Sequence, residues 1–90
     1  MADLKDKAVI ITGGGTGIGK AIALTLAASG VSVLVNYSRS SVEAEETAHE
    51  VQQLGVQALA HKADVSKDED VCAMFAAAHK EFGRIDFLAE

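Results

Sequence analysis

The chain has 90 residues, enough for one small domain, and a formal net charge of −5. Its 8 Lys and Arg residues stand against 13 Asp and Glu residues, which argues against a nucleic-acid partner because no basic stripe exists to release counterions. No apolar stretch approaches the roughly 20 residues that span a bilayer, and the N-terminus is too polar for a signal peptide, so we expect a cytoplasmic protein with no membrane contact.

The first predicted strand, residues 7–12, is an apolar run that leads directly into a dense group of glycines. Residues 12–19 read T-G-G-G-T-G-I-G, and a helix is predicted over 18–29. Glycines at this point let the backbone turn tightly and bring its N–H groups, with the positive end of the helix dipole, against a phosphate. The turn therefore predicts a pyrophosphate-binding site.

The spacing of these glycines separates several kinds of nucleotide site. No glycine begins the common dinucleotide pattern G-x-G-x-x-G. The P-loop pattern G-x-x-x-x-G-K-[ST] fits residues 14–20 but requires a hydroxyl where Ala21 stands, so triphosphate hydrolysis is the weaker alternative. The pattern that fits is G-x-x-x-G-x-G, at Gly13, Gly17 and Gly19.

Strand and helix patterns alternate along the rest of the chain without a linker or a repeat. Further strands are predicted over 31–36, over 56–63 and from 85 to 89. Two further helices are predicted from a capping box and a closing glycine each: Ser40 with Glu43 and Gly55, then Ser66 with Glu69 and Gly83. This alternation predicts an α/β fold, a partial doubly wound (Rossmann) three-layer arrangement whose parallel sheet has about four strands in the order 3-2-1-4.

The helix patterns also predict which side chains are buried. The inner face of the second helix is expected to hold these residues: Val42, Ala44, Thr47, Ala48, Val51 and Leu54. Cys72, the single cysteine, lies among apolar neighbours and is expected to be a buried structural thiol. The three histidines are too far apart for metal-ligand spacing on one element, and no metal site is expected.

The glycine motif and three later segments together resemble the short-chain dehydrogenase/reductase family. That family carries T-G-x-x-x-G-[IL]-G, and the later segments are Asn36-Tyr37-Ser38-Arg39, Asp64-Val65 and residues 83–88. The resemblance covers essentially the whole chain in the order of the family's N-terminal half. It implies that residues 1–90 form the N-terminal half of a Rossmann dinucleotide-binding domain, similar to oxoacyl reductases and glucose dehydrogenases of the family. The full-length form is then expected to transfer hydride between NADP(H) and a carbonyl or alcohol.

Ligands of doubly wound sheets bind beyond the carboxyl ends of the strands, near the point where the strand order reverses. This rule brings together the loops 13–19, 37–40 and 64–66. The resemblance implies that Asp64 hydrogen-bonds the adenine amino group, that the backbone of Val65 contacts the ring, and that Asn36 and Tyr37 lie near the adenosine ribose. The candidate cofactor-binding residues are Gly13, Gly15, Thr16, Gly17, Ile18, Gly19, Asn36, Tyr37, Ser38, Arg39, Asp64 and Val65.

Structural interpretations of the same residues stay open. The glycines are also suited to close packing of helix on strand, Tyr37 to covering the sheet edge, and Asp64 to an Asx turn before the third helix. NADP is favoured over NAD because positions 33–40 contain Arg39 with two serines and contain no Asp or Glu. NAD stays the alternative, since Arg39 is equally suited to a solvated loop and Thr16 stands where many NADP-dependent family members carry a basic residue.

Catalytic residues of the resembled family have no counterpart in this sequence. The family uses a Y-x-x-x-K motif with an upstream serine, whereas the single tyrosine here, Tyr37, is followed four residues later by Ser41. We therefore expect the 90 residues to bind the dinucleotide without catalysis, and to form a homo-oligomer or pair with a C-terminal half. The alternative is a stand-alone, non-catalytic nucleotide-binding or assembly module.

Overall fold

The computed structural model describes residues 5–13, 17–39 and 41–89. Strands and helices alternate along the chain, as the sequence predicts. In order they are β1 (Ala8–Thr12), α1 (Gly17–Ala28), β2 (Ser32–Tyr37), α2 (Ser41–Gln52), β3 (Ala58–Lys62), α3 (Asp68–Phe82) and β4 (Phe87–Ala89). Among the described residues, no helix is long and apolar enough to cross a membrane.

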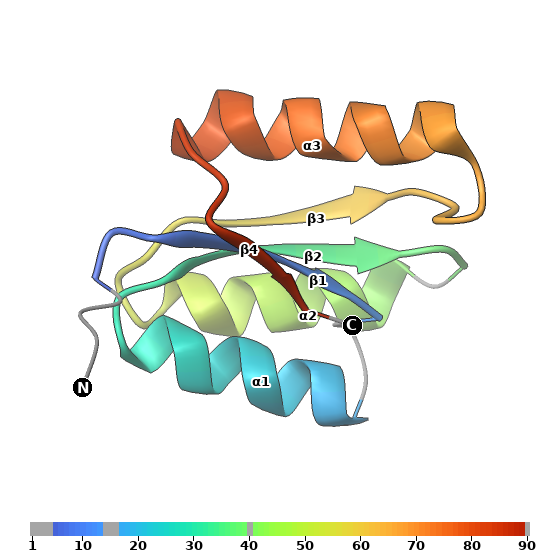
Figure 1. The fold of residues 1–90 in the computed structure, drawn as a ribbon. Helices are drawn as coiled ribbons and strands as arrows, with labels where there is room; N and C mark the ends of the chain where they lie inside the picture. Colours follow the sequence, from blue (N-terminus) through green and yellow to red (C-terminus); the bar gives the residue numbers. More distant parts are fainter. Residues whose placement is uncertain (1–4, 14–16, 40, 90) are drawn as a thin grey trace.

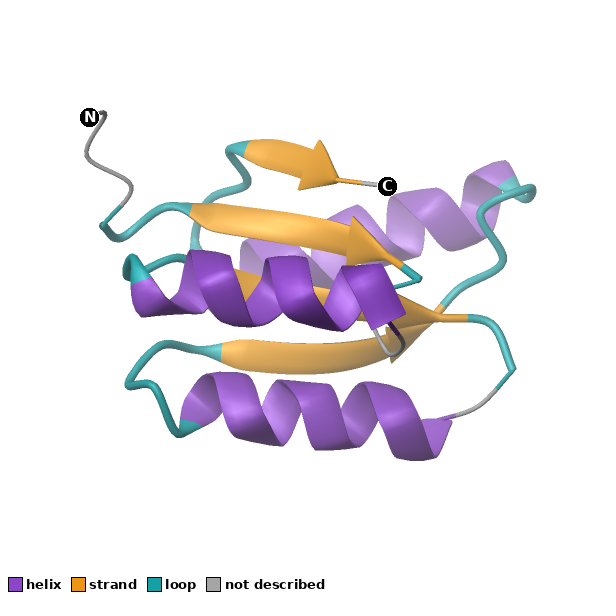
Figure 2. Cartoon of the chain, turned by 90° about the horizontal axis from the view of Figure 1, so that it is seen from below, coloured by secondary structure: helices purple, strands orange, loops and turns teal. Residues whose placement is uncertain are grey.

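The strands form one parallel sheet in the order β3-β2-β1-β4, which confirms the predicted order. Helix α3 covers one face of the sheet, and α1 and α2 lie side by side against the other (Figures 1 and 2). This is the three-layer doubly wound arrangement. Because the strands are parallel, the carboxyl ends of β1, β2 and β3 lie next to one another on one side of the sheet.

The core consists of two apolar layers, one on each face of the sheet. Strands β1 and β2 are buried on both faces, which is why they read as continuous apolar runs rather than alternating ones. The layer beneath α1 and α2 contains Val9, Ile11, Ala23, Ala27, Val31, Val33, Val35, Ala44, Ala48 and Val51. The layer beneath α3 contains Ile10, Leu34, Ala63, Met74 and Ala78. Small alanines on the helices allow close approach to the sheet.

Two predictions about α3 are wrong. Ser66 does not cap this helix, because the N-cap residue is Lys67 and makes no side-chain capping bond. The Ser66 hydroxyl instead donates to the Asp64 carboxylate. Cys72 is exposed, because it lies two positions from the buried Met74 and therefore points about 200° away from it around the helix.

The glycine predicted to end α3 is confirmed in that role. Gly83 adopts a left-handed conformation, with φ of 76°, and its N–H donates to the His79 carbonyl. On α2, Ala44, Thr47, Ala48 and Val51 are buried as predicted.

The predicted burial is wrong for the first and last residues of the inner face of α2. Val42 is 63% exposed because it lies two residues before Ala44, and Leu54 is 49% exposed because the helix ends at Gln52. The capping prediction for Ser40 falls outside the described residues.

Candidate functional site

The glycine turn after β1 has backbone conformations that favour glycine. Gly13 has φ of 66° and Gly17 has φ of 46°, both in the left-handed region. A Cβ atom placed on either residue meets nothing within 4 Å. The turn therefore needs glycine for its conformation, and it faces open space.

A pocket of about 340 Å³ occupies this space at the carboxyl end of β1. The described residues that line it are Ile11, Thr12, Gly13, Gly17, Ile18, Gly19 and Ile22. Helix α1 begins here at Gly17, and its first turn carries no acidic side chain that would repel an anion. The described residues thus fit a phosphate group. The predicted cofactor residues Gly15 and Thr16 lie outside the described part of the chain.

At the end of β2, consecutive residues point to opposite faces of the sheet. Tyr37 is half-buried against the layer of α1 and α2. Asn36 is only 4% exposed, and its side-chain amide donates to the Ala63 carbonyl over 3.1 Å. Ser38 and Arg39 follow in the loop and are exposed. Of these four candidates, the two loop residues are the most exposed.

The turn between β3 and α3 is organised around Asp64. One carboxylate oxygen, Oδ1, accepts hydrogen bonds from the Ser66 hydroxyl at 2.6 Å and the Ser66 N–H at 2.9 Å. The same two bonds, with the hydroxyl first, hold the pKa of the Asp64 carboxyl below its usual value of 3.8. Both Asp64 and Val65 are exposed. The Asx turn is therefore present, and it leaves an ionised carboxylate at the surface.

Two contacts of this region were not anticipated from the sequence. The Asp64 N–H donates to Oδ2 of Asp70, in the first turn of α3, over 2.9 Å. The other is the amide bond from Asn36 to Ala63. A polar residue at the end of an otherwise apolar strand was the available signal for Asn36. Asp70 gave none, since acidic residues are common in any first helical turn.

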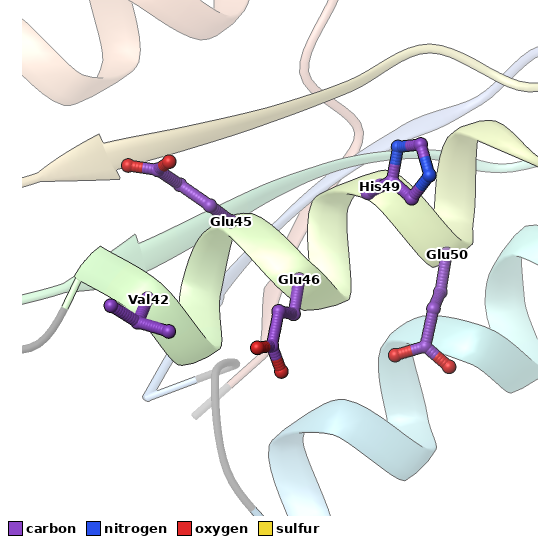
Figure 3. Close-up of a pocket in the computed structure, with 5 residues that line it drawn as sticks. All are labelled: Val42, Glu45, Glu46, His49 and Glu50. Atoms are coloured by element: carbon purple, nitrogen blue, oxygen red, sulfur yellow. The ribbon is translucent and has the colours of Figure 1, made fainter.

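A second hollow, of about 470 Å³, lies along the outer face of α2 (Figure 3). Its lining residues are Val42, Glu45, Glu46, His49 and Glu50. Glu50 pairs with Lys20 of α1 over 2.7 Å, and this pair raises the pKa of the Lys20 ammonium. Within the described ranges, no group of three or more His, Cys, Asp or Glu side chains is arranged to hold a metal ion. This acidic face ties α2 to α1 through the Lys20–Glu50 pair.

Comparisons with known proteins identify the family of the whole chain. The family model described as short chain dehydrogenase matches residues 7–90. The short-chain dehydrogenase/reductase homolog YusS of Bacillus subtilis is 52% identical over 83 residues, which are 92% of this chain and 76% of that protein. The tetrahydroxynaphthalene reductase PfmaG of Pestalotiopsis fici is 46% identical over 81 residues, 90% of this chain and 29% of that protein.

Solved structures show the same relation. NAD⁺-bound xylitol dehydrogenase matches with a TM-score of 0.87 and 31% identity, over 97% of this chain and 33% of that one. Hydroxysteroid dehydrogenase from Escherichia coli matches with a TM-score of 0.85 and 40% identity, over 94% of this chain and 36% of that one. The chain thus spans about a third of these solved relatives. It belongs to the short-chain dehydrogenase/reductase family.

Proposed function

We propose that residues 1–90 are the NADP(H)-binding N-terminal half of a Rossmann domain, from a short-chain dehydrogenase/reductase that transfers hydride between NADP(H) and a carbonyl or alcohol. The observation that carries the proposal is the open, left-handed glycine turn between the buried strand β1 and helix α1. When bound, the nicotinamide dinucleotide supplies the hydride chemistry. The residues of this chain bind and orient it.

The pyrophosphate is assigned to the turn that contains Gly13, Gly17 and Gly19, where α1 begins. Gly13 and Gly17 have no Cβ, and nothing occupies the space where one would stand, so phosphate oxygens can approach the N–H groups. Gly15, Thr16 and Ile18 belong to the same assigned segment. Ile18 is 80% exposed and forms the outer wall of the pocket.

The adenosine is assigned to the neighbouring ends of β2 and β3. Asp64 is exposed and ionised at neutral pH, which suits acceptance of a hydrogen bond from the adenine amino group. Val65 is 55% exposed and offers an apolar contact to the ring. Tyr37 and Asn36 flank the assigned ribose position.

We assign NADP rather than NAD as the cofactor because of the exposed segment that follows β2. Ser38 and Arg39 lie there, where a guanidinium suits a 2′-phosphate. NAD is the alternative, and the xylitol dehydrogenase relative holds NAD⁺. Titration of the 90-residue chain with NADP⁺ and NAD⁺ by isothermal calorimetry tests the assignment. Saturable binding that is tighter for NADP⁺ is expected, and no binding of either nucleotide would contradict the proposed function.

An apolar surface on α1 supports association with another polypeptide segment. Ile18, Ala21, Ile22, Thr25 and Leu26 line a hollow of about 280 Å³ on this helix. Strand β4 is an edge strand of the described sheet, and its Leu88 is 47% exposed. Exposed apolar surface beside a sheet edge favours association. We assign it to a second copy of the chain or to a C-terminal half, as in the longer relatives.

Light scattering coupled to gel filtration measures this association. The 90-residue chain is expected to exceed the mass of a monomer at high concentration, and Ile18→Lys is expected to shift it toward monomer. Ala76→Lys, at an exposed position of helix α3, is the control for the added charge. A monodisperse wild-type monomer at every concentration would contradict the assignment.

The alternative function is a stand-alone, non-catalytic nucleotide-binding or assembly module. An assay of NADPH oxidation with mixed carbonyl substrates separates the two descriptions. The 90 residues alone are expected to bind NADPH without oxidising it, and restored oxidation on addition of a C-terminal half favours the oxidoreductase. We also propose that the protein is cytoplasmic.

A further inference from the structure

One peptide group in the turn after β3 is held at both of its polar atoms by side chains from other elements. The carbonyl of Ala63 accepts a hydrogen bond from Nδ2 of Asn36, on β2, over 3.1 Å. The N–H of Asp64 donates to Oδ2 of Asp70, on α3, over 2.9 Å. This carbonyl and this N–H belong to the same planar peptide unit, so the two side chains together fix the orientation of its plane.

The neighbouring atoms restrain the unit further. The Ala63 N–H donates to the Tyr37 carbonyl over 2.9 Å, which anchors the strand end before the peptide. After it, the Lys67 N–H donates to the Asp64 carbonyl over 2.9 Å. Asn36 is buried at 4% exposure, so its bond to Ala63 is shielded from competing water.

The fixed plane, together with the bonds that Lys67 makes to the Asp64 carbonyl and Ser66 makes to its carboxylate, orients the Asp64 side chain. Its Oδ1 is occupied by the hydroxyl and the N–H of Ser66. Within the described part of the chain, no hydrogen bond reaches the other oxygen, Oδ2. The exposed carboxylate is thus anchored by one oxygen and keeps the other available to a ligand. Such preorganisation lowers the entropy cost of binding.

We infer that Asp70 and Asn36 are positioning residues that hold the Ala63–Asp64 peptide so that the Asp64 carboxylate meets the adenine amino group of the dinucleotide. The inference rests on the proposed function, in which Asp64 makes that contact. Each positioning residue acts through the orientation of Asp64.

A purely structural role of Asp70 is separable from this one. Asp68 lies in the same first turn of α3 and carries the same charge toward the same helix N-terminus. Among the described residues, the side chain of Asp68 makes no hydrogen bond. Asp68→Ala therefore reproduces the loss of charge at the helix start and leaves the peptide plane held, which makes it the matched control for Asp70→Ala.

The first test compares two dinucleotides that differ at the adenine amino group. The probes are NADP⁺ and nicotinamide hypoxanthine dinucleotide phosphate, whose base carries an oxygen in place of that amino group. The wild-type chain is expected to prefer NADP⁺ by about tenfold, the range of a hydrogen bond to a charged group. Asp70→Ala is expected to reduce this preference to about twofold. Asp70→Asn keeps an acceptor oxygen and should retain most of it, and Asp68→Ala should match the wild type.

The preference between the two dinucleotides decides between positioning and mere destabilisation. A loss of affinity that is equal for both probes in Asp70→Ala overturns the inference, because a structural defect weakens both alike. The same follows if the wild-type chain shows no preference for adenine.

The second test uses the chain without ligand. Amide hydrogen exchange by NMR is expected to show a protected Asp64 N–H in the wild type and in Asp68→Ala, and exchange at least about tenfold faster in Asp70→Ala. Unchanged exchange in Asp70→Ala overturns the inference. If neither dinucleotide binds to the wild type, the proposed function fails, and the exchange measurement still decides whether Asp70 fixes the peptide.

Discussion

The sheet has an amino edge, where its strands begin, and a carboxyl edge, where they end. The backbone groups at these two edges find their hydrogen-bond partners in different ways. At the amino edge, neighbouring segments bond one another: the Asp6 N–H donates to the Gly30 carbonyl at 3.0 Å, and the Ser32 N–H to the Lys7 carbonyl at 2.8 Å. Ala8 and Asp86 exchange two bonds, from the Asp86 N–H to the Ala8 carbonyl at 2.9 Å and from the Ala8 N–H to the Asp86 carboxylate at 2.8 Å. This edge is closed by its own residues.

The carboxyl edge is open by contrast. A glycine turn faces free space beside Gly13, a pocket of about 340 Å³ lies at the end of β1, and charged side chains at Arg39 and Asp64 reach the solvent. Both edges belong to the same parallel strands, so strand geometry does not distinguish them. The difference lies in the loop residues, and it places the glycine turn and the exposed Arg39 and Asp64 side chains on one side only.

The largest expected effect comes from filling the space at the carboxyl edge. Gly13→Ala is expected to lower NADP⁺ affinity by at least about tenfold, because the added methyl occupies the open side of the turn and an L-residue is strained at φ of 66°. Gly55→Ala is the matched control, since Gly55 has φ of 92° and equally open surroundings between α2 and β3. Calorimetric titration measures both variants.

The control separates the effect of backbone strain from the effect of a methyl group that fills the open side of the turn. Gly55→Ala should lower the melting temperature to a similar extent as Gly13→Ala while leaving the affinity unchanged. Equal affinity losses in the two variants would show that backbone strain alone explains the effect and that the turn does not receive the pyrophosphate.

A smaller effect is expected at the end of β2. Arg39→Ala should weaken NADPH by about fivefold and leave NADH almost unchanged, because an exposed guanidinium contributes a screened interaction with the 2′-phosphate. Lys80→Ala, at the exposed end of α3, removes the same charge away from the open edge. The ratio of the two dissociation constants by fluorescence titration is the measurement. An equal loss for both nucleotides in Arg39→Ala would remove the assignment of NADP.

The element types, the strand order and the position of the glycine turn could be predicted from local patterns. Periods of apolar residues indicate strand or helix, and the right-handed crossover rule converts their alternation into one sheet order. The exposure of Cys72 was mispredicted because apolar neighbours in sequence include both faces of a helix, and only contact with the sheet selects Met74 and Ala78 as the inner face.

The candidate site was less predictable than the fold because its hydrogen bonds join residues far apart in the chain. Ser66 fits the capping-box pattern, yet its hydroxyl donates to the nearby Asp64 carboxylate, and the N-cap residue is Lys67. Asn36 is predicted to lie near the ribose, and the pattern gave no sign that its amide also donates to the carbonyl of Ala63, 27 residues later. Sequence patterns report neighbours along the chain, and these contacts depend on how β2, β3 and α3 meet at the edge.

The smallest expected effect concerns the closed amino edge and its dependence on pH. Asp86 accepts hydrogen bonds from Arg84, with Nε at 2.8 Å and Nη2 at 2.7 Å, and from the Ala8 N–H. The Arg84 side chain first, and then the Ala8 N–H, hold the pKa of the Asp86 carboxyl below its usual 3.8. A carboxyl whose pKa is lower in the folded state stabilises the fold above its unfolded pKa, about 4, and this stabilisation is lost as the pH falls through the folded value.

Asp86→Asn is therefore expected to lower the melting temperature by a few degrees at pH 7, and the difference from wild type should shrink steadily as the pH is lowered from 5 to about 2.5. Scanning calorimetry across this range measures it, with Asp68→Asn as the control for loss of one negative charge. NADP⁺ affinity at pH 7 should stay at the wild-type value, because Asp86 lies at the opposite edge from the glycine turn. A constant difference in melting temperature at every pH would show that the packing of the side chain, and not its ionised carboxylate, closes the amino edge.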